Sequence, residues 1–336
     1  MSTPHNILIT SISKKIPLIK AVRKALENIG SGKIFGGDSN FSCIGRYFVD
    51  EFWLMPFQGI LTIDEIIDFC KQKNIRAIIP TRDGELPFFA KHKEQLNQEG
   101  IACLVPSKKT VELCLDKFLF YTFLAKNKLP AIPTAKNISA IDAQSYVVKE
   151  CFGAGSVSIG LDLTLSEAKE WGTKLKHPIY QPYIHGTEYS LDLYIDHQGS
   201  CLGSIVRERE LVCDGESQVT VSVHHPEIDH LCRKAAELLG IRGPAVFQVL
   251  SDRSKHLHLI ECNPRFGGAS TLSVMMGLKI FDWFFQESFN LPLTPFHRPP
   301  NEMRQVRYPE DIVIDIPDVV QNLAFLARQN PGDRTS

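Results

Sequence analysis

The sequence predicts a small doubly wound α/β domain followed by a larger α+β body. In residues 1 to about 107, short β-branched runs alternate with segments whose apolar residues follow helical spacing. This alternation is typical of a parallel sheet covered by helices on both faces. From about residue 146, strand-like runs dominate instead. A chain of 336 residues with 43% hydrophobic residues is also long enough to form two or three domains.

The N-terminal pattern begins with a strand at 7–10, and a helix follows in which residues such as Ile19, Val22 and Leu26 have helical spacing. The same alternation then predicts a strand at 33–36, a helix at 62–73, and strands at 77–80 and 102–105. The C-terminal limit of this domain is placed at residue 107, because Ser107 is a suitable helix N-cap.

The rest of the chain reads as a mixture of helices and antiparallel strands. Two consecutive helices are expected between Ser107 and Leu129, ahead of the helix-breaking prolines Pro130 and Pro133. Further strands are predicted at 146–149, 159–163, 188–195, 201–206, 218–223, 245–250 and 257–262, with helices at 166–176 and 228–239. The stretch from about residue 299 is Pro-rich, and residues 329–336 are expected to fray.

The composition excludes several classes of protein. The formal net charge is −1, so no global positive field attracts nucleic acid or an anionic membrane. No leader-like N-terminus and no apolar run of about 18 residues is present, which favours a cytoplasmic protein. The nine cysteines form no Cys-x-x-Cys pair, and we interpret them as reduced thiols.

Two glycine-rich segments resemble nucleotide-binding loops but lack required residues. In residues 30–34, Ile34 stands where a phosphate loop needs a magnesium-binding serine or threonine. In residues 153–158, Ser158 replaces the third glycine of a dinucleotide fingerprint. The sequence therefore predicts neither a P-loop nor an NAD site.

A hairpin near the C-terminal end carries the strongest chemical signal. Gln248 and Glu261 lie on its two expected strands and can face each other, while Glu261 and Asn263 share a face because side chains alternate along a strand. One carboxylate and two amide oxygens form a reasonable partial site for Mg²⁺, which prefers oxygen ligands and keeps water and phosphate in its shell. Arg265 follows closely and can reach the same phosphates.

The run from Glu261 to Gly268, Glu-Cys-Asn-Pro-Arg-Phe-Gly-Gly, resembles the E-x-N-P-R signature of the ATP-grasp superfamily. Gln248 in the same hairpin resembles the branch that contains carbamoyl phosphate synthase. Three further segments resemble family elements in the family's order. Asp116-Lys117 resembles the first ATP-binding lysine, and Val147-Val148-Lys149 with Gly153-Ala154-Gly155-Ser156 resembles the second lysine and its flexible loop. The run from Gln181-Pro182-Tyr183-Ile184 through Glu188 resembles the hinge strand and the ribose-binding acid.

This resemblance covers almost the whole chain and implies a domain organisation. Residues 1–107 would be the pre-ATP-grasp domain, and residues 108–180 the small lobe with linker helices and a glycine-rich lid. Residues 181–300 would form the large lobe, and 301–336 a C-terminal extension that is partly frayed.

The resemblance also implies an activity, in which MgATP phosphorylates a carboxylate and an amine or similar nucleophile attacks the acyl phosphate. The implied cofactors are ATP and Mg²⁺ or Mn²⁺, and the substrates are a small carboxylic acid and an amine, with no nucleic-acid or membrane partner. Gln248, Glu261 and Asn263 are the implied metal ligands, and Arg265 and Lys149 act on the phosphates. The oligomeric state is left open, with a homodimer as one option.

Some assignments have alternatives. Arg207 and Arg209 resemble a basic stretch that faces the acyl substrate in relatives, but ordinary salt bridges within the strand explain them equally well. The acceptor acid is expected near residues 82–85, at the end of a parallel strand, although a tight turn would have the same composition. Val157 and Gln181 depart from the family pattern. A small-molecule kinase or carbamoyl-phosphate-type phosphotransferase and a non-catalytic ATP-binding protein therefore remain alternatives.

Overall fold

A computed structural model describes residues 5–153, 158–213 and 215–314. Residues 1–305 form one compact unit and residues 306–336 another, and the sites discussed below lie in the first. Within the first unit, the domain boundaries expected from the sequence stay a prediction. In the part of the chain that the structure describes, no helix has the length and apolar character needed to cross a membrane.

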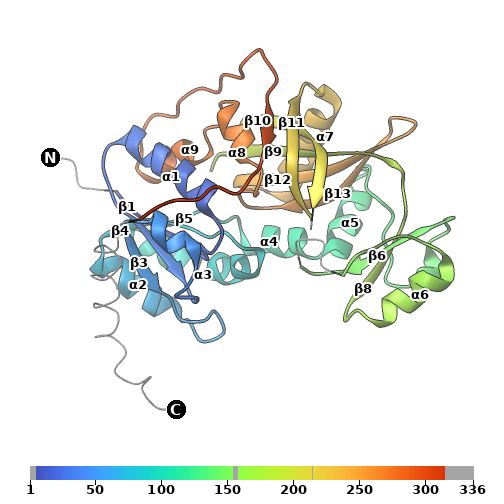
Figure 1. Cartoon of the computed structure of the whole chain (residues 1–336), viewed down its shortest axis with the longest axis horizontal. Coiled ribbons are helices and arrows are strands. Elements are labelled where there is room, and N and C mark those ends of the chain that lie inside the picture. Colours follow the sequence, from blue (N-terminus) through green and yellow to red (C-terminus); the bar gives the residue numbers. More distant parts are fainter. Residues whose placement is uncertain (1–4, 154–157, 214, 315–336) are drawn as a thin grey trace. The chain divides into compact units, whose positions relative to one another are not determined.

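The N-terminal part is a parallel five-stranded sheet with the strand order β3-β2-β1-β4-β5 (Figure 1). Its elements in chain order are β1 (Asn6–Thr10), α1 (Ile16–Ile29), β2 (Ile34–Asp38), η1 (Ile44–Phe48), β3 (Glu51–Leu54), α2 (Ile63–Gln72), β4 (Ile75–Ile79), η2 (Asp83–Glu85), α3 (Leu86–Gln98) and β5 (Ala102–Cys103). All five residues of β1 are buried, as expected for the central strand of a sheet covered on both faces. The doubly wound prediction is confirmed.

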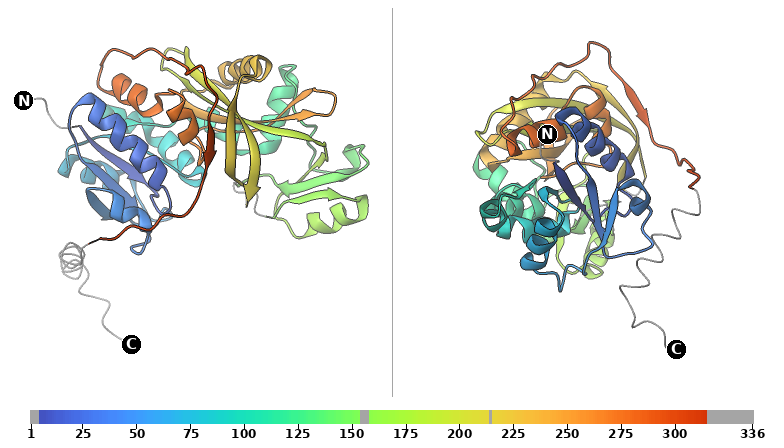
Figure 2. Two further views of the ribbon diagram at one scale, coloured as in Figure 1. Left: turned by 45° about the horizontal axis from the view of Figure 1, so that its top comes forward. Right: turned by 90° about the vertical axis from the view of Figure 1, so that its left-hand side faces the viewer.

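The next part contains two helices and a small antiparallel sheet. These elements are α4 (Lys108–Leu115), α5 (Lys117–Lys126), η3 (Ile138–Ala140), β6 (Tyr146–Glu150), β7 (Gly160–Leu163), α6 (Leu165–Thr173) and β8 (Pro178–Pro182). The strand order is β7-β6-β8, and Figure 2 shows α6 along one face of this sheet. Helix α6 begins with a capping box between Thr164 and Glu167, and its buried Ala168 packs against Tyr146 and Val148.

The largest sheet has six strands in the order β13-β12-β9-β10-β11-β14. Its elements and those around it are β9 (Gly186–Ile195), β10 (Cys201–Cys213), β11 (Glu216–Val223), α7 (Pro226–Leu239), β12 (Gly243–Asp252), β13 (Leu257–Asn263), α8 (Thr271–Met275), α9 (Ile280–Ser288) and β14 (Arg304–Val306). The α+β prediction for this body is confirmed. Strand β10 extends well beyond the expected end at residue 206, because its outer half pairs with β11.

One hydrophobic core joins the parallel sheet to the large sheet. Leu18 and Val22 of α1 belong to the same buried cluster as Phe281 and Phe285 of α9. This shared core holds the carboxyl-terminal edge of the parallel sheet beside the segment that follows β13.

Candidate active site

The β12–β13 hairpin brings together the three expected metal ligands. Gln248 pairs directly with Glu261 in the antiparallel register, and Val246 pairs with Asn263. The Asn263 Nδ2 donates to Glu261 Oε1 at 3.0 Å, so these two side chains lie on the same face. The expected geometry of the hairpin is therefore present, while the metal-binding role of these residues stays a prediction.

Lys149 places a buried amine beside this hairpin. It lies on β6 opposite Ile179 of β8, and only 9% of the residue is exposed. Burial, opposed by the Glu261 carboxylate and assisted by the Lys117 charge, lowers the pKa of the Lys149 amine to about 8. Mutual electrostatic effects place Lys149, Lys117 and Glu261 in one neighbourhood, although they come from three different elements.

Lys117 connects the start of α5 to the turn after β6. Asp116 caps this helix by accepting hydrogen bonds from the backbone N–H groups of Phe118 and Leu119. The Lys117 Nζ donates to the Gly153 carbonyl at 2.6 Å. A helix start and a glycine turn thus present one cation to the same space as Lys149. Gly155 and Ser156, expected to continue this loop, lie outside the described residues.

The hinge between the two antiparallel sheets is formed by the end of β8. The Gln181 side chain is buried, and its Nε2 donates to Thr134 Oγ1 at 2.7 Å. Gln181 therefore braces the hinge. Tyr183 N–H donates to the Ser145 carbonyl, whereas Ile184 N–H has no backbone carbonyl as acceptor among the described residues. The Ile184 backbone is thus free to donate to a planar ligand in the adjoining pocket.

Glu188 at the start of β9 forms an ion pair with Arg209 of β10. The guanidinium of Arg209 also donates to Ser217 Oγ at 2.9 Å and to the Gly215 carbonyl at 2.8 Å. These contacts keep Arg209 in a fixed position with its charge toward the pocket. The sequence placed Arg209 in a basic stretch but contained no signal that it pairs with Glu188.

Arg207 lies away from this pocket, and 2% of it is exposed. Its Nε donates to Asp192 Oδ2 at 2.5 Å, and Asp192 also accepts hydrogen bonds from the hydroxyls of Ser270 and Ser273. Gly267 N–H in turn donates to Ser270 Oγ at 3.0 Å. In the described structure Arg207 therefore braces the turn that follows Arg265, which corresponds to the salt-bridge alternative raised from the sequence.

Arg265 joins the large sheet to the parallel sheet. Its Nε and Nη2 donate to the two carboxylate oxygens of Asp83, each at 2.6 Å. Both side chains are largely buried, at 15% and 13% exposure. Lys15, at the start of α1, is close enough to feel the charges of both residues, and burial together with the Arg265 charge lowers the pKa of its amine. Sequence reasoning missed Lys15, since it only follows the polar turn after the first strand.

One pocket of about 2020 Å³, partly open to solvent, unites most of these groups. Ten of the residues expected from the sequence line it: Lys117, Lys149, Gly153, Gln181, Pro182, Tyr183, Ile184, Glu188, Gln248 and Glu261. Asn263 adjoins the pocket through its bond to Glu261. Arg207 and Arg265 are not among the lining residues. A large pocket with polar and apolar lining, two lysines, and a carboxylate and an amide that can bind a metal through oxygen fits a nucleoside triphosphate with its metal.

Two family models match the chain. The model described as "PylC-like, N-terminal domain" matches residues 7–104, and the model described as "ATP-grasp in the biosynthetic pathway with Ter operon" matches residues 174–312. Pyruvate carboxylase of Staphylococcus aureus is 25% identical over 296 residues, which is 77% of this chain. The chain spans about a quarter of the length of that curated relative.

Solved structures with the same architecture include two nucleotide complexes. The biotin carboxylase domain of Hydrogenobacter thermophilus 2-oxoglutarate carboxylase, with MgADP, ADP and bicarbonate, has a TM-score of 0.74 at 16% identity over 91% of this chain and 75% of that one. The N5-carboxyaminoimidazole synthetase of Staphylococcus aureus with ADP has a TM-score of 0.74 at 14% identity over 98% and 87%. At these identities the likeness shows the fold. Together with the two family matches, this likeness confirms the resemblance to the ATP-grasp superfamily that the ordered motifs predict.

Proposed function

We propose that this chain is an ATP-dependent, ADP-forming ligase that phosphorylates a small carboxylic acid and joins the acyl group to an amine. The observation that carries the proposal is that Lys117, Lys149 and Glu261 meet in one pocket although they lie on three separate elements. Two lysines and a carboxylate that line one pocket match the needs of a triphosphate and its cation.

The donor set fits Mg²⁺ or Mn²⁺. Gln248, Glu261 and Asn263 offer one carboxylate and two amide oxygens, and soft sulfur or imidazole ligands are absent from this trio. When bound there, the cation neutralises the charge of the transferring phosphoryl group. The Glu261–Asn263 hydrogen bond orients the carboxylate for this role.

The remaining pocket residues account for the rest of the nucleotide. We place the adenine at the hinge, where Ile184 N–H can donate to a ring nitrogen, and the ribose near Glu188. The Arg209 guanidinium would share the Glu188 carboxylate with the ribose hydroxyls and hold it in place. Lys117 and Lys149 then face the phosphates. Their positive charges stabilise the transferring group without rearrangement at the moment of reaction.

We place the acceptor acid beside Arg265 and Lys15, outside the nucleotide pocket but next to the part of the pocket that we assign to the phosphates. The bidentate Asp83 pair holds Arg265 in one orientation. Lys15 adds a second cation near Arg265, and the carboxylates of Asp83, Glu85 and Glu216 also act on its amine. We infer that these cations bind the carboxylate of the acceptor acid, as a ligase requires and a kinase for hydroxyl compounds does not.

The first test is chemical trapping of the acyl phosphate. Hydroxylamine attacks mixed anhydrides, so we expect a hydroxamate whose formation depends on MgATP and on the acid supplied. ADP release measured in the same reaction gives the matching count of turnovers. If ADP and a stable phosphate ester form but no hydroxamate does, the result supports the kinase alternative. If the protein binds nucleotide but releases no ADP with any acid, the result supports a non-catalytic protein.

The second test uses the titration of Lys149. Its amine has a pKa of about 8 in the nucleotide-free protein, and phosphate binding favours the protonated form. Above pH 8 the amine must therefore take up a proton on binding, and the affinity for ADP should fall by up to about tenfold per pH unit. Titration calorimetry from pH 7 to 9.5 measures this slope. Adenosine, which has no phosphate, should bind with little pH dependence, and a flat ADP profile would contradict the assignment.

We propose that the protein acts in the cytoplasm, with a homodimer as one option for its assembly state. The biotin carboxylase domain cited above was crystallised as a dimer. Sedimentation velocity with and without MgADP measures the assembly state.

A further inference from the structure

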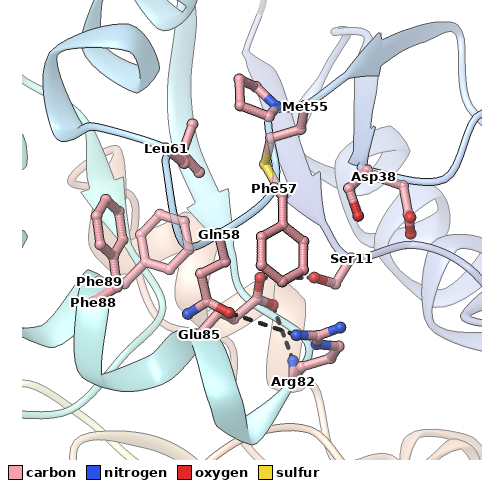
Figure 3. Close-up of a pocket in the computed structure, with 12 residues that line it drawn as sticks. Ser11, Asp38, Met55, Phe57, Gln58, Leu61, Arg82, Glu85, Phe88 and Phe89 are labelled. Atoms are coloured by element: carbon pink, nitrogen blue, oxygen red, sulfur yellow. Dashed lines mark hydrogen bonds between the residues drawn. The ribbon is translucent and has the colours of Figure 1, made fainter.

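A second pocket lies in the parallel sheet, at the carboxyl-terminal ends of β1 and β4 (Figure 3). In the strand order β3-β2-β1-β4-β5, strands β2 and β3 lie on one side of β1, and strands β4 and β5 lie on the other. The gap between β1 and β4 is thus the switch point where doubly wound sheets bind ligands. Ser11, which follows β1, and Arg82 and Glu85, which follow β4, line the pocket.

The far wall of this pocket is apolar. Met55, Leu61 and Phe89 are buried members of the domain's core that also face the pocket. Phe57 lies at its mouth with 67% of the residue exposed, and Figure 3 shows its ring between Met55 and Arg82. The space measures about 440 Å³ when the part open to solvent is included. Its apolar wall has the chemistry to contact an aliphatic chain or an aromatic ring.

The polar side of the pocket is rigid. Glu85 accepts hydrogen bonds from Thr81 N–H, Arg82 N–H and the Ser11 hydroxyl, and these three bonds fix the turn after β4. Ser11 adopts a φ of 53°, which is uncommon for a serine. The Arg82 guanidinium makes one long contact, 3.5 Å, to Gln58 Oε1 among the described residues. Its other donors remain available.

The same two loops also lie beside Arg265. In the turn after β4, Arg82 faces the apolar pocket, while its neighbour Asp83 binds Arg265. In the loop after β1, Ser11 faces the apolar pocket, while Lys15 lies near Arg265. A molecule whose carboxylate lies between Arg82 and Arg265 therefore extends its other end into the apolar pocket.

We propose that this pocket holds the hydrocarbon chain of the acceptor acid, so that the enzyme selects carboxylic acids with an aliphatic or aromatic chain. This inference rests on the proposed function and names the substrate class for it. Lys15, Arg82 and Arg265 surround the carboxylate, and Phe57 covers the chain. A substrate with a second charged group at its far end would meet Met55, Leu61 and Phe89, and it is selected against because the charge would lose its hydration there.

The test compares acids that differ only in their chain. Acetate, isovalerate and phenylacetate form one series, and glycine, leucine and phenylalanine form another; both are assayed for MgATP-dependent hydroxamate. We expect kcat/KM to rise with chain length, by about fourfold for each methylene that becomes buried. Aspartate and lysine should be poor substrates. Equal use of long and short acids would overturn this inference alone, whereas the absence of hydroxamate with every acid would overturn the proposed function and this inference with it.

Phe57→Ala and Ile60→Ala form a matched pair for the same assay. Both are exposed apolar residues between β3 and α2, but only Phe57 lines the pocket, and Ile60 is 74% exposed. Phe57→Ala should raise KM for the best long-chain acid by about tenfold, with KM for MgATP and for the short acids unchanged. Ile60→Ala should have the KM values of the parent protein for the long-chain acid, for MgATP and for the short acids. Identical effects of the two substitutions on KM would overturn the inference. Both variants should fold, because both side chains are highly exposed.

Discussion

Replacement of Glu261 by glutamine is expected to lower turnover by about a thousandfold or more, which corresponds to at least about 4 kcal/mol of lost transition-state stabilisation. The substitution preserves the size of the side chain and its hydrogen bond with Asn263 but removes the charge of the carboxylate. The melting temperature should change little, since Glu261 forms no ion pair with a basic residue among the described residues. Turnover is measured as ADP release in the presence of the acid.

Metal binding gives a second readout for Glu261→Gln. Binding of Mn²⁺ in the presence of ADP, followed by electron paramagnetic resonance, should weaken in step with turnover. Glu210→Gln is the matched control, because Glu210 lies on the same sheet, is exposed and pairs with Arg304 outside the pocket. Gln248→Glu, which adds a carboxylate opposite Glu261, should have the milder effect. Normal turnover in a folded Glu261→Gln protein would remove Glu261 from the metal site.

Arg265→Lys is expected to lower turnover by about a hundredfold, the usual effect of losing a preorganised donor at the reacting group. Lysine keeps the charge but cannot make the two parallel hydrogen bonds that Arg265 makes with Asp83. The free energy of unfolding should also fall, because a largely buried carboxylate loses its bidentate partner. Denaturant unfolding and ADP release measure the two effects separately.

The chain contains a matched pair for this comparison. Arg304 and Glu210 form the same bidentate geometry, at 2.8 and 2.7 Å, but at an exposed position. Arg304→Lys should therefore leave both stability and turnover close to those of the parent protein. Asp83→Asn should lower turnover less than Arg265→Lys, because Asp83 only positions the guanidinium. An Arg265→Lys protein with parental kcat would show that Arg265 contributes to structure alone.

Local patterns were enough to predict most of the elements. The apolar spacing of α1 and α2 and the alternation along β12 and β13 were visible in short windows, and these elements occur close to the expected positions. The expectations did not include β3, α3, α8 and α9. Helix α9 has only nine residues and buries most of them, including Phe281, Trp283 and Phe285, so the segment is too short for a helical period to stand out from a buried apolar run.

The sequence by itself predicted the ATP-grasp resemblance, the order of its motifs and the pairing of Gln248 with Glu261. The short connection and the period of two predict that the two strands pair, and a register shift between Gln248 and Val249 brings Glu261 rather than Ile260 opposite Gln248. Only the tertiary structure decided that Arg265 pairs with Asp83, that Arg207 is buried against Asp192, and that the turns after β1 and β4 share an apolar pocket. Arg265 and Asp83 are 182 residues apart, and their contact depends on how separate elements pack around a common core. No local pattern encodes such packing, because each side chain alone is equally compatible with an exposed surface position.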